Sequence, residues 1–279
     1  MTRGAVIAAC LARACRLDVV ACKPGNVSLW SPGHGMQARD FLTSARVAVP
    51  ALCRDGATVG ARIENAMRAT LDAVGCNTNL GIVLLLAPLA AAAARGGLLR
   101  ADLAAVLATL DRDDAAAAFR AIAFTQPAGL GQVAEGDVRE DPRMTLREAM
   151  ALAAIRDRIA AAYVDDYAEV FDHAVPTLLA LRARWRSLAW ASTACFLQLL
   201  AAAPDSHIVR KWGGALADEV SARARTLESA LKACENPRAV VPRLRAFDDE
   251  LKSRGVNPGT SADLTVASVA VLLLRERLA

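Results

Sequence analysis

Residues 22–28 read Cys-Lys-Pro-Gly-Asn-Val-Ser, and this short segment separates two stretches of helix-forming sequence. Proline restricts the residue before it to extended conformations, and glycine accepts backbone angles that other residues resist. The segment therefore predicts a fixed turn from which the ammonium of Lys23 projects beside free backbone N–H groups, an arrangement that can bind an anion. The alternative is an ordinary helix end followed by a solvated lysine.

The composition of the 279-residue chain predicts an all-α fold. Hydrophobic residues make up 54% of the sequence and aromatic residues only 4%. Alanine and leucine favour helices, whereas β-branched and aromatic residues favour strands. The longest irregular stretch, residues 126–143, has apolar helical sequence on both sides that reads as one core. We therefore expect a single domain over residues 1–279, a multi-helix bundle of about ten or more helices.

Apolar periodicity, together with proline and glycine at helix ends, places the individual helices. The uncharged stretch 80–94 is shorter than the ~20 residues that a membrane span needs, so we predict that it is a buried core helix. The predicted helices cover residues 5–21, 38–53, 59–74, 80–94, 100–110, 113–124, 145–163, 176–203, 237–254 and 266–274, with a further helix that begins at His207.

Charge and cysteine usage exclude several classes of function. The net charge of +4 is mild and no dense Lys/Arg block is present, so we expect no nucleic-acid partner. Charged residues within 1–22 are unlike a secretory signal, and we predict a soluble, cytoplasmic protein with no membrane partner. Seven cysteines without CxxC spacing and only three histidines argue against a disulfide framework and against a zinc or His-rich metal site.

Polar residues gather directly before the uncharged helix, where the sequence reads Asn77-Thr78-Asn79. A single residue of this kind is enough to cap a helix. Three of them leave spare groups, which suit a phosphate because free N–H groups and the helix dipole favour anions at that end. Capping alone is the alternative explanation.

A carboxylate falls on the apolar face of the predicted helix 145–163. At 100° per residue, Asp157 lies in the same stripe as Leu146 and Met150. A buried carboxylate is costly unless a cation or a metal accompanies it. Asp157 is therefore either one half of an internal ion pair, with Arg156 or Arg158, or part of a ligand site.

Two segments in the last third of the chain carry further candidates. His207, Arg210 and Lys211 lie in the first two turns of their predicted helix, where cations oppose the dipole and an anion nearby would relieve them. Thr260 and Asp263 have the spacing of a capping box, which by itself explains both residues.

Five blocks occur in order along the chain: Lys23-Pro24-Gly25-Asn26-Val27, Phe41 with Ser44-Ala45, Asn77-Thr78-Asn79-x-Gly81, Arg210-Lys211-x-Gly213 and Pro258-Gly259-x-x-Ala262-Asp263-Leu264. Together they resemble the triphosphoribosyl-dephospho-CoA synthase family. The resemblance implies an all-α enzyme that releases adenine from ATP. It transfers the 5-triphosphoribosyl group to a hydroxyl of 3'-dephospho-CoA, which yields a prosthetic-group precursor.

The sequence also departs from the classical members of that family. They carry His-x-Asp-Met where this chain has Gly33-His34-Gly35-Met36, and usually histidine at the position of Asn79. Their Gly-Ala-Arg-Gly-Glu block has no match here. The middle of the chain, from Pro127 through Asp137 to Asp157, is similar to a divergent branch found in archaea and methylotrophic bacteria.

The resemblance and the reaction together assign roles. Transfer at the anomeric carbon of a triphosphorylated ribose calls for cations on the phosphates, carboxylates for Mg²⁺ and a base for the acceptor hydroxyl. His34 or His207 is the expected acid or base, and His173 is expected at the surface. Catalytic candidates are His34, Asp157 and Asp263; nucleotide-binding candidates are Lys23, Gly25, Asn26, Ser44, Asn77, Thr78, Asn79, Arg210 and Lys211; Mg²⁺ candidates are Asp137, Asp157 and Asp263.

Three classes of function remain open at this point. The first is the ATP-dependent transferase with a dephospho-CoA-like acceptor. The second is a related enzyme that uses a nucleotide on another acceptor, such as a methanopterin-type one-carbon-carrier precursor in a methylotroph. The third is a non-catalytic helical nucleotide-binding protein. A homodimer is compatible with the sequence.

Overall fold

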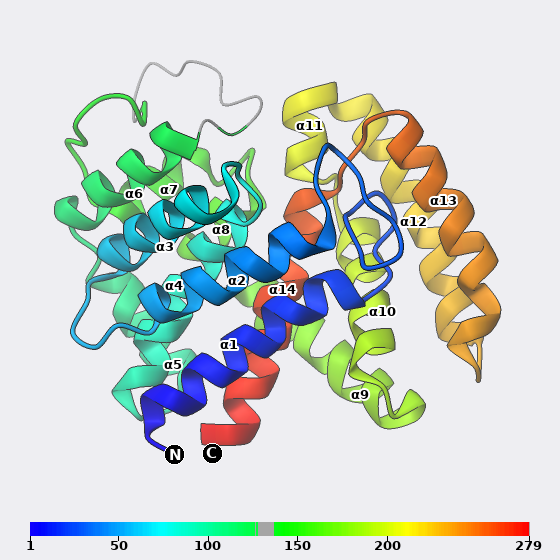
Figure 1. The fold of residues 1–279 in the computed structure, drawn as a ribbon, viewed down its shortest axis with the longest axis horizontal. Coiled ribbons are helices and arrows are strands. Elements are labelled where there is room, and N and C mark those ends of the chain that lie inside the picture. The colour runs from blue at the N-terminus through cyan, green and yellow to red at the C-terminus, as the bar shows by residue number, and fades with distance from the viewer. Residues whose placement is uncertain (126, 128–136, 279) are drawn as a thin grey trace.

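The computed structural model describes residues 1–125, 127 and 137–278, and these residues form a bundle of helices (Figure 1). Among them no strand occurs, and only two isolated β-bridges join Ser28 to Ser31 and Gly33 to Met36. The predicted all-α bundle is confirmed. The helices are α1 (Arg3–Val20), α2 (Ala38–Leu52), α3 (Val59–Val74), α4 (Leu80–Arg95), α5 (Leu99–Ala108), α6 (Arg112–Thr125), α7 (Leu146–Ala153), α8 (Arg158–Val164), π-helical η1 (Glu169–Ala174), α9 (Val175–Trp185), α10 (Leu188–Ala202), α11 (Ser206–Trp212), α12 (Gly214–Ala233), 3₁₀ η2 (Pro237–Val240), α13 (Val241–Ser253) and α14 (Gly259–Leu278).

The C-terminal helix α14 runs through the centre of the bundle (Figure 1). It packs against α1, α4, α9 and α10, helices from both halves of the chain. Every residue from Leu264 to Leu274 is buried, as expected of a helix that is apolar all round. Its buried hydroxyls are satisfied within the helix, since Thr265 and Ser268 each donate to the carbonyl four residues earlier, at 2.7 Å. This helix carries Asp263 into the interior.

Helix α4 is the buried core helix that the uncharged stretch predicts. It contains Pro88, which has no N–H to give to the carbonyl of Leu84. The hydroxyl of Tyr163 donates to that carbonyl instead, at 2.6 Å, so α8 is fixed to α4 at the point where the helix lacks a bond. None of the described helices is by itself long and apolar enough to cross a membrane; α4 and α5 meet that test only as a pair bent by 115°.

The single helix predicted over 145–163 is wrong. Two helices, α7 and α8, occupy this range, and the chain turns between Ala153 and Arg158. Asp157 ends the turn as the N-cap of α8, and its Oδ1 accepts from the N–H groups of Ile159 at 2.9 Å and Ala160 at 3.4 Å. Aspartate competes for backbone N–H groups in this way and so favours helix starts over helix interiors.

Two other predicted helices are also divided. The range 176–203 is broken at Arg186, whose backbone is left-handed (φ 51°), and Ser187 caps α10 through a bond from the N–H of Trp190. The range 237–254 begins as η2 before α13 continues it. Of the irregular stretch 126–143, residues 126 and 128–136, including Ala128-Gly129-Leu130-Gly131, lie outside the described residues.

The turn at residues 22–28 is fixed, as predicted, and α13 holds it in place. Asp248 accepts from the N–H of Gly25 at 2.8 Å and from the hydroxyl of Ser31 at 2.6 Å. Lys252 bonds the carboxylate of Asp248 and the carbonyl of Ser31. Gly25 has φ 80°, and a Cβ there would lie 2.7 Å from Cδ of Pro258. Only glycine therefore allows the turn to pack against the segment that precedes α14.

All seven cysteines are free thiols. Burial raises the pKa of Cys15 and of Cys195 to about 12, and the pKa of Cys22 and of Cys53 to about 11. Because the thiolate is the reactive form of cysteine, these four thiols are poor nucleophiles at neutral pH.

Candidate active site

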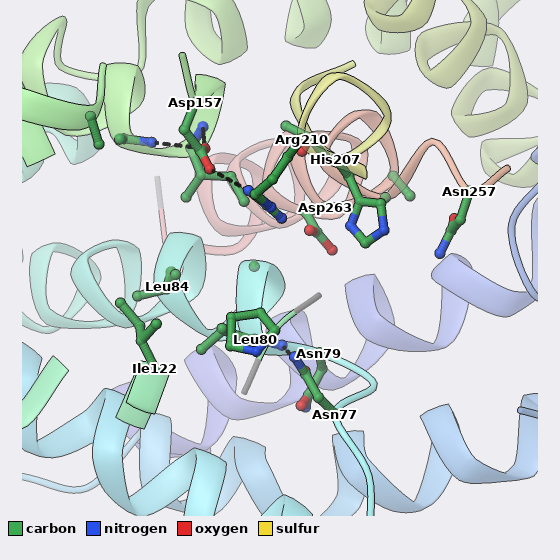
Figure 2. Close-up of a pocket in the computed structure, with 18 of the residues that line it drawn as sticks. Asn77, Asn79, Leu80, Leu84, Ile122, Asp157, His207, Arg210, Asn257 and Asp263 are labelled. Carbon is green, nitrogen blue, oxygen red and sulfur yellow. Dashed lines mark hydrogen bonds and ion pairs between the residues drawn. The ribbon is translucent and has the colours of Figure 1, made fainter. Parts of the chain in front are cut away.

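A pocket of about 690 Å³ opens between α4, α6, α7, α8, α11 and α14. Figure 2 shows Asp263, His207 and Arg210 on one side of it and Asn77 and Asn79 on the other, with Leu84 and Ile122 along the apolar part. Of the candidates predicted from the sequence, the pocket is lined by Asn26, His34, Asn77, Thr78, Asn79, Asp137, Asp157, His207, Arg210, Lys211 and Asp263. Among the described residues, Lys23, Gly25 and Ser44 do not reach its wall.

Asp263 is the carboxylate that points into the pocket without a protein partner among the described residues. It lies in the second turn of α14, so the capping box predicted for Thr260 and Asp263 is wrong: the helix begins at Gly259 and contains both residues. Burial, and then the nearby carboxylate of Asp18, raise the pKa of Asp263 well above its usual range, and the ammonium of Lys23 opposes this. An unpaired carboxylate in such surroundings marks a site for a cation or a positively charged group.

The space for that carboxylate comes from Gly81, in the first turn of α4. A Cβ on Gly81 would lie 2.0 Å from Oδ2 of Asp263, 2.6 Å from its Cγ and 2.7 Å from Cδ1 of Ile159. Any larger residue must therefore displace the Asp263 side chain. The close approach of Asp263 explains why the second residue of the apolar helix α4 is a glycine.

We expect Gly81→Ala to lower the rate of the catalysed reaction by about 10²-fold, because a displacement of about 1 Å at a reacting centre has that cost. The matched control is Gly214→Ala in the first turn of α12, where an added Cβ meets nothing within 4 Å. Steady-state kinetics and thermal melts of both variants check this. Equal activity of the two variants would show that the Gly81–Asp263 contact has no role in the reaction.

Lys23 is not the solvated or projecting lysine that the sequence suggests. Its exposed fraction is 2%, and its ammonium bonds the carboxylate of Asp18, which is 4% exposed. Asp18 lines the pocket, and the two charges form a buried ion pair directly behind it. Lys23 therefore acts on the pocket through its charge, which also reaches Asp263.

The three polar residues before α4 divide their functions. Asn77 caps the helix through a bond from the N–H of Leu80 at 3.1 Å. Thr78 donates to the hydroxyl of Ser44, at 2.6 Å, and Ser44 donates to the carbonyl of Asp40. The Oδ1 atom of Asn79 is buried and has no hydrogen-bond partner among the described residues. Asn79 is thus the residue of the three that keeps a spare polar atom, and it lines the pocket.

Asn26 contributes a second group of this kind. Its amide nitrogen donates to Oδ1 of Asn257 at 3.0 Å, while its own Oδ1 is buried without a partner among the described residues. Buried polar atoms in proteins almost always have a partner, so an unpaired one calls for an explanation. Asn26 and Asn79 both line the pocket, and a bound polar ligand is the simplest explanation for both.

The ion pair predicted for Asp157 exists, but with a different arginine. Its Oδ2 accepts from Arg210 at 3.1 Å, whereas Arg158 is bound to Glu169 and to Oγ of Ser261. Helix α11, which carries Arg210 and Lys211, has only seven residues. Both cations therefore lie in its last turn, where they complement the dipole, and the prediction that they oppose it is wrong. They line the pocket nevertheless.

Two of the three histidines meet at the pocket. Nε2 of His34 lies 2.8 Å from the carbonyl oxygen of Gly25 and must donate to it, because a carbonyl only accepts. His34 also has a left-handed backbone, φ 56°, which is uncommon outside glycine. The ring of His207 lines the pocket on the same side as Asp263 (Figure 2). His173 is exposed, as predicted.

The carboxylates do not form a ready-made metal site. Among the described residues no group of three or more His, Cys, Asp or Glu side chains could hold a metal ion. Asp137 accepts from the N–H of Arg139 at 3.0 Å and pairs with its guanidinium, and Asp157 is bound as described above. Mg²⁺ in nucleotide sites needs only one or two protein carboxylates, since phosphates and water supply the rest. The pocket fits that requirement through Asp263.

Sequence reasoning missed Asp18 and Arg156, both of which line the pocket. The helical period of the sequence could have identified Asp18, because this carboxylate falls on the buried face of α1 together with Leu11, Ala14 and Cys15. For Arg156 the sequence suggests only an ion pair with Asp157. Arg156 lies in the turn between α7 and α8 and bonds the carbonyl of Leu152 instead.

A sequence profile of the ATP:dephospho-CoA triphosphoribosyl transferase (CitG) family matches residues 5–279. The chain belongs to this family. Comparison with curated proteins gave no significant match. Among solved structures the CitG-family chain resembles a crystal structure from Archaeoglobus fulgidus whose name assigns it provisionally as a triphosphoribosyl-dephospho-CoA synthase. The TM-score is 0.67 at 23% identity, over 85% of this chain and all of the other. At that identity the likeness shows the shared fold.

Membership of the CitG family identifies the chain as a transferase whose substrates are ATP and dephospho-CoA. The five sequence blocks that resemble the family lie around one pocket or directly behind it: Asn26, Asn79, Arg210 and Asp263 line the wall, and Lys23 lies behind Asp18. The second block contributes Phe41 to the wall directly, whereas Ser44 of the same block reaches the pocket only through Thr78.

Proposed function

We propose that the pocket transfers the 5-triphosphoribosyl group of ATP to a hydroxyl of 3'-dephospho-CoA and releases adenine. The observation that carries this proposal is the convergence of two buried unpaired amide oxygens, on Asn26 and Asn79, with the unpartnered carboxylate of Asp263 in one pocket. The amide groups suit the hydroxyls of a ribose. A carboxylate beside them suits the positive charge that develops on the anomeric carbon as adenine leaves.

The charges of the pocket support a metal-bound polyphosphate. Its described wall carries three permanent cations, Arg156, Arg210 and Lys211, against four carboxylates, Asp18, Asp137, Asp157 and Asp263. A triphosphate therefore needs a further cation. We propose Mg²⁺, with Asp263 as the protein ligand that is available and Asp137 and Asp157 as the other carboxylates within the pocket. When bound, the ion neutralises charge on the phosphates.

The other residues have supporting roles in this proposal. Lys211, Arg210 and Arg156 bind the triphosphate. Asn77 and Thr78 fix the start of α4, and Ser44 anchors Thr78 to α2. Gly25 allows the turn that carries Asn26, so that Asn79 and Asn26 face the ribose. Lys23 keeps Asp18 neutralised behind the site. A base must also take the proton of the acceptor hydroxyl, and His34 and His207 are both within the pocket wall.

The test is incubation of the purified protein with ATP, Mg²⁺ and 3'-dephospho-CoA, with adenine measured by chromatography and the acceptor by mass spectrometry. We expect adenine release that depends on the acceptor, and a product heavier by the triphosphoribosyl group. Adenine release with a pterin-type acceptor but not with dephospho-CoA would assign the enzyme to a different acceptor. Nucleotide binding without any adenine release would contradict the proposed catalysis.

A further inference from the structure

The proposed reaction needs a proton acceptor, and the described pocket wall offers two histidines for it, on different elements. His34 lies on the loop between α1 and α2, and His207 on α11. The Nε2–H of His34 is occupied as a donor to the carbonyl of Gly25. Among the described residues, no hydrogen bond holds either ring nitrogen of His207, so its ring is the one available to a substrate.

The position of His207 is fixed through its backbone, and this leaves the ring free to act. Oδ1 of Asp205 accepts from the N–H of His207 at 2.9 Å, while Oδ2 accepts from the N–H and the hydroxyl of Ser261 at 2.7 and 2.8 Å. One buried carboxylate thus ties the start of α11 to the first turns of α14. The imidazole packs over Gly259, where an added Cβ would lie 3.4 Å from Nδ1.

The same arrangement places His207 next to the proposed reacting centre. Figure 2 shows the ring and the Asp263 side chain on the same side of the pocket, and the ring packs over Gly259, which lies one turn before Asp263 on α14. Asp205 and Ser261 join α11 and α14, so the start of α11 is held against the turn of α14 that precedes Asp263. The His207 ring therefore lines the same part of the pocket as the carboxylate proposed to face the ribose.

We infer that His207 is the general base that takes the proton of the acceptor hydroxyl, an inference that rests on the proposed transfer reaction. As the acceptor oxygen bonds to C1' of the ribose, the C1'–N9 bond breaks and its electron pair passes to adenine. The hydroxyl proton moves to the His207 ring, and adenine takes up a proton from water. His207 then returns its proton to water, so the reaction consumes no net proton. The role of His34 is to position the loop.

The electrostatic surroundings favour the neutral form that a base requires. Burial lowers the pKa of His207, and Arg210, Lys211 and His34 lower it further, while Asp205 acts in the opposite direction. Arg210 and Lys211 belong to α11, Asp205 is the N-cap of that helix, and His34 lies on the loop between α1 and α2. Asp263 faces the pocket from α14. This direction favours the neutral ring, which is the form that can accept a proton.

The three histidines of the chain provide a matched set of variants: His207→Asn, His34→Asn and, as the exposed control outside the pocket, His173→Asn. With saturating ATP, Mg²⁺ and dephospho-CoA, we expect His207→Asn to lower kcat by about 10²–10⁴-fold, the range of general-base catalysis. Its ATP dissociation constant, measured by calorimetry, should stay within about threefold of wild type, as for a residue that acts only in the chemical step. His34→Asn should lose about tenfold or less, and His173→Asn nothing.

The pH profile distinguishes a base from a merely structural residue. In wild type and His34→Asn, kcat should rise as pH increases through the pKa of His207, and His207→Asn should lack this rise. A measurement that needs no His207 variant is NMR of wild-type protein with labelled histidine rings, in which His34→Asn and His173→Asn identify the remaining signal. Addition of dephospho-CoA without ATP should shift the His207 ring.

Three results would overturn the inference in an active protein: a kcat for His207→Asn within about threefold of wild type, an unchanged pH profile, or a His207 ring signal that does not respond to dephospho-CoA. Weakened ATP binding in His207→Asn at unchanged kcat would also overturn it, because it would assign His207 to nucleotide binding. Absence of adenine release from wild type is a different result, since it contradicts the proposed function itself.

Discussion

Replacement of Asp263 by asparagine is expected to lower the rate of adenine release by about 10²–10³-fold, the usual cost of removing a group that stabilises transition-state charge. Asparagine has nearly the same shape and can occupy the space beside Gly81, but it lacks the charge that would hold Mg²⁺ or face the anomeric carbon. Helical content should not change. Kinetics with saturating ATP and dephospho-CoA, together with circular dichroism, measure both effects.

The same variant should be at least as stable as wild type at neutral pH. The folded-state pKa of Asp263 is raised, first by burial and then by Asp18. A carboxyl group whose folded pKa is raised contributes its stability below the unfolded pKa and loses it as pH rises through the folded pKa. Asparagine cannot ionise. At pH values above the folded pKa of Asp263, the melting temperature of the Asp263→Asn protein should therefore equal or exceed that of wild type. A clear drop in stability there, or full activity, would contradict the role given to Asp263.

The second large effect is on stability: Lys23→Ala should lower the free energy of unfolding by about 3–5 kcal/mol, because it leaves the Asp18 carboxylate buried without its cation. This result differs from the sequence-based expectation, in which the ammonium of Lys23 projects from the turn and binds an anion. The reason is the burial of both partners. Chemical denaturation followed by circular dichroism measures the change.

The double variant Asp18→Leu/Lys23→Met is the control for this explanation. Apolar residues of similar size often replace a buried ion pair at little cost, so the double variant should recover most of the stability that Lys23→Ala loses. It should nevertheless be inactive, because the ammonium of Lys23 no longer acts on the pocket and on Asp263. If Lys23→Ala were as stable as wild type, the buried ion pair would not be essential to the fold.

Local sequence signals predicted the helices well where the chain ends them with its own residues. Helix α3 begins at the cap Thr58 and ends at Gly75, which has φ 75°, and the predicted range 59–74 agrees with it. The prediction of one helix over 145–163 is wrong because the 3.6-residue apolar period continues across the break between α7 and α8. The period places Asp157 on the apolar stripe of a single helix, whereas its side chain caps the start of α8.

The sequence predicts which types of residue form the candidate site, but it does not predict which of their side chains contact each other. Sequence alone cannot show that Lys23 folds back onto Asp18, since this depends on the turn that Asp248 and Lys252 of α13 hold in place. The partner of Asp157 was misassigned for a related reason. Arg210 is 53 residues away, and only the packing of α11 against α14 brings it close. The contact of Gly81 with Asp263 is equally a product of tertiary packing.

The most direct test of the central claim is a crystal structure of the protein with ATP and Mg²⁺ in the absence of an acceptor. We predict that the triphosphate lies against Lys211 and Arg210, with the ribose between Asn79 and Asp263 and its anomeric carbon open toward His207. A nucleotide bound outside this pocket, or one whose ribose and phosphates make no approach to Asp263, would contradict the account.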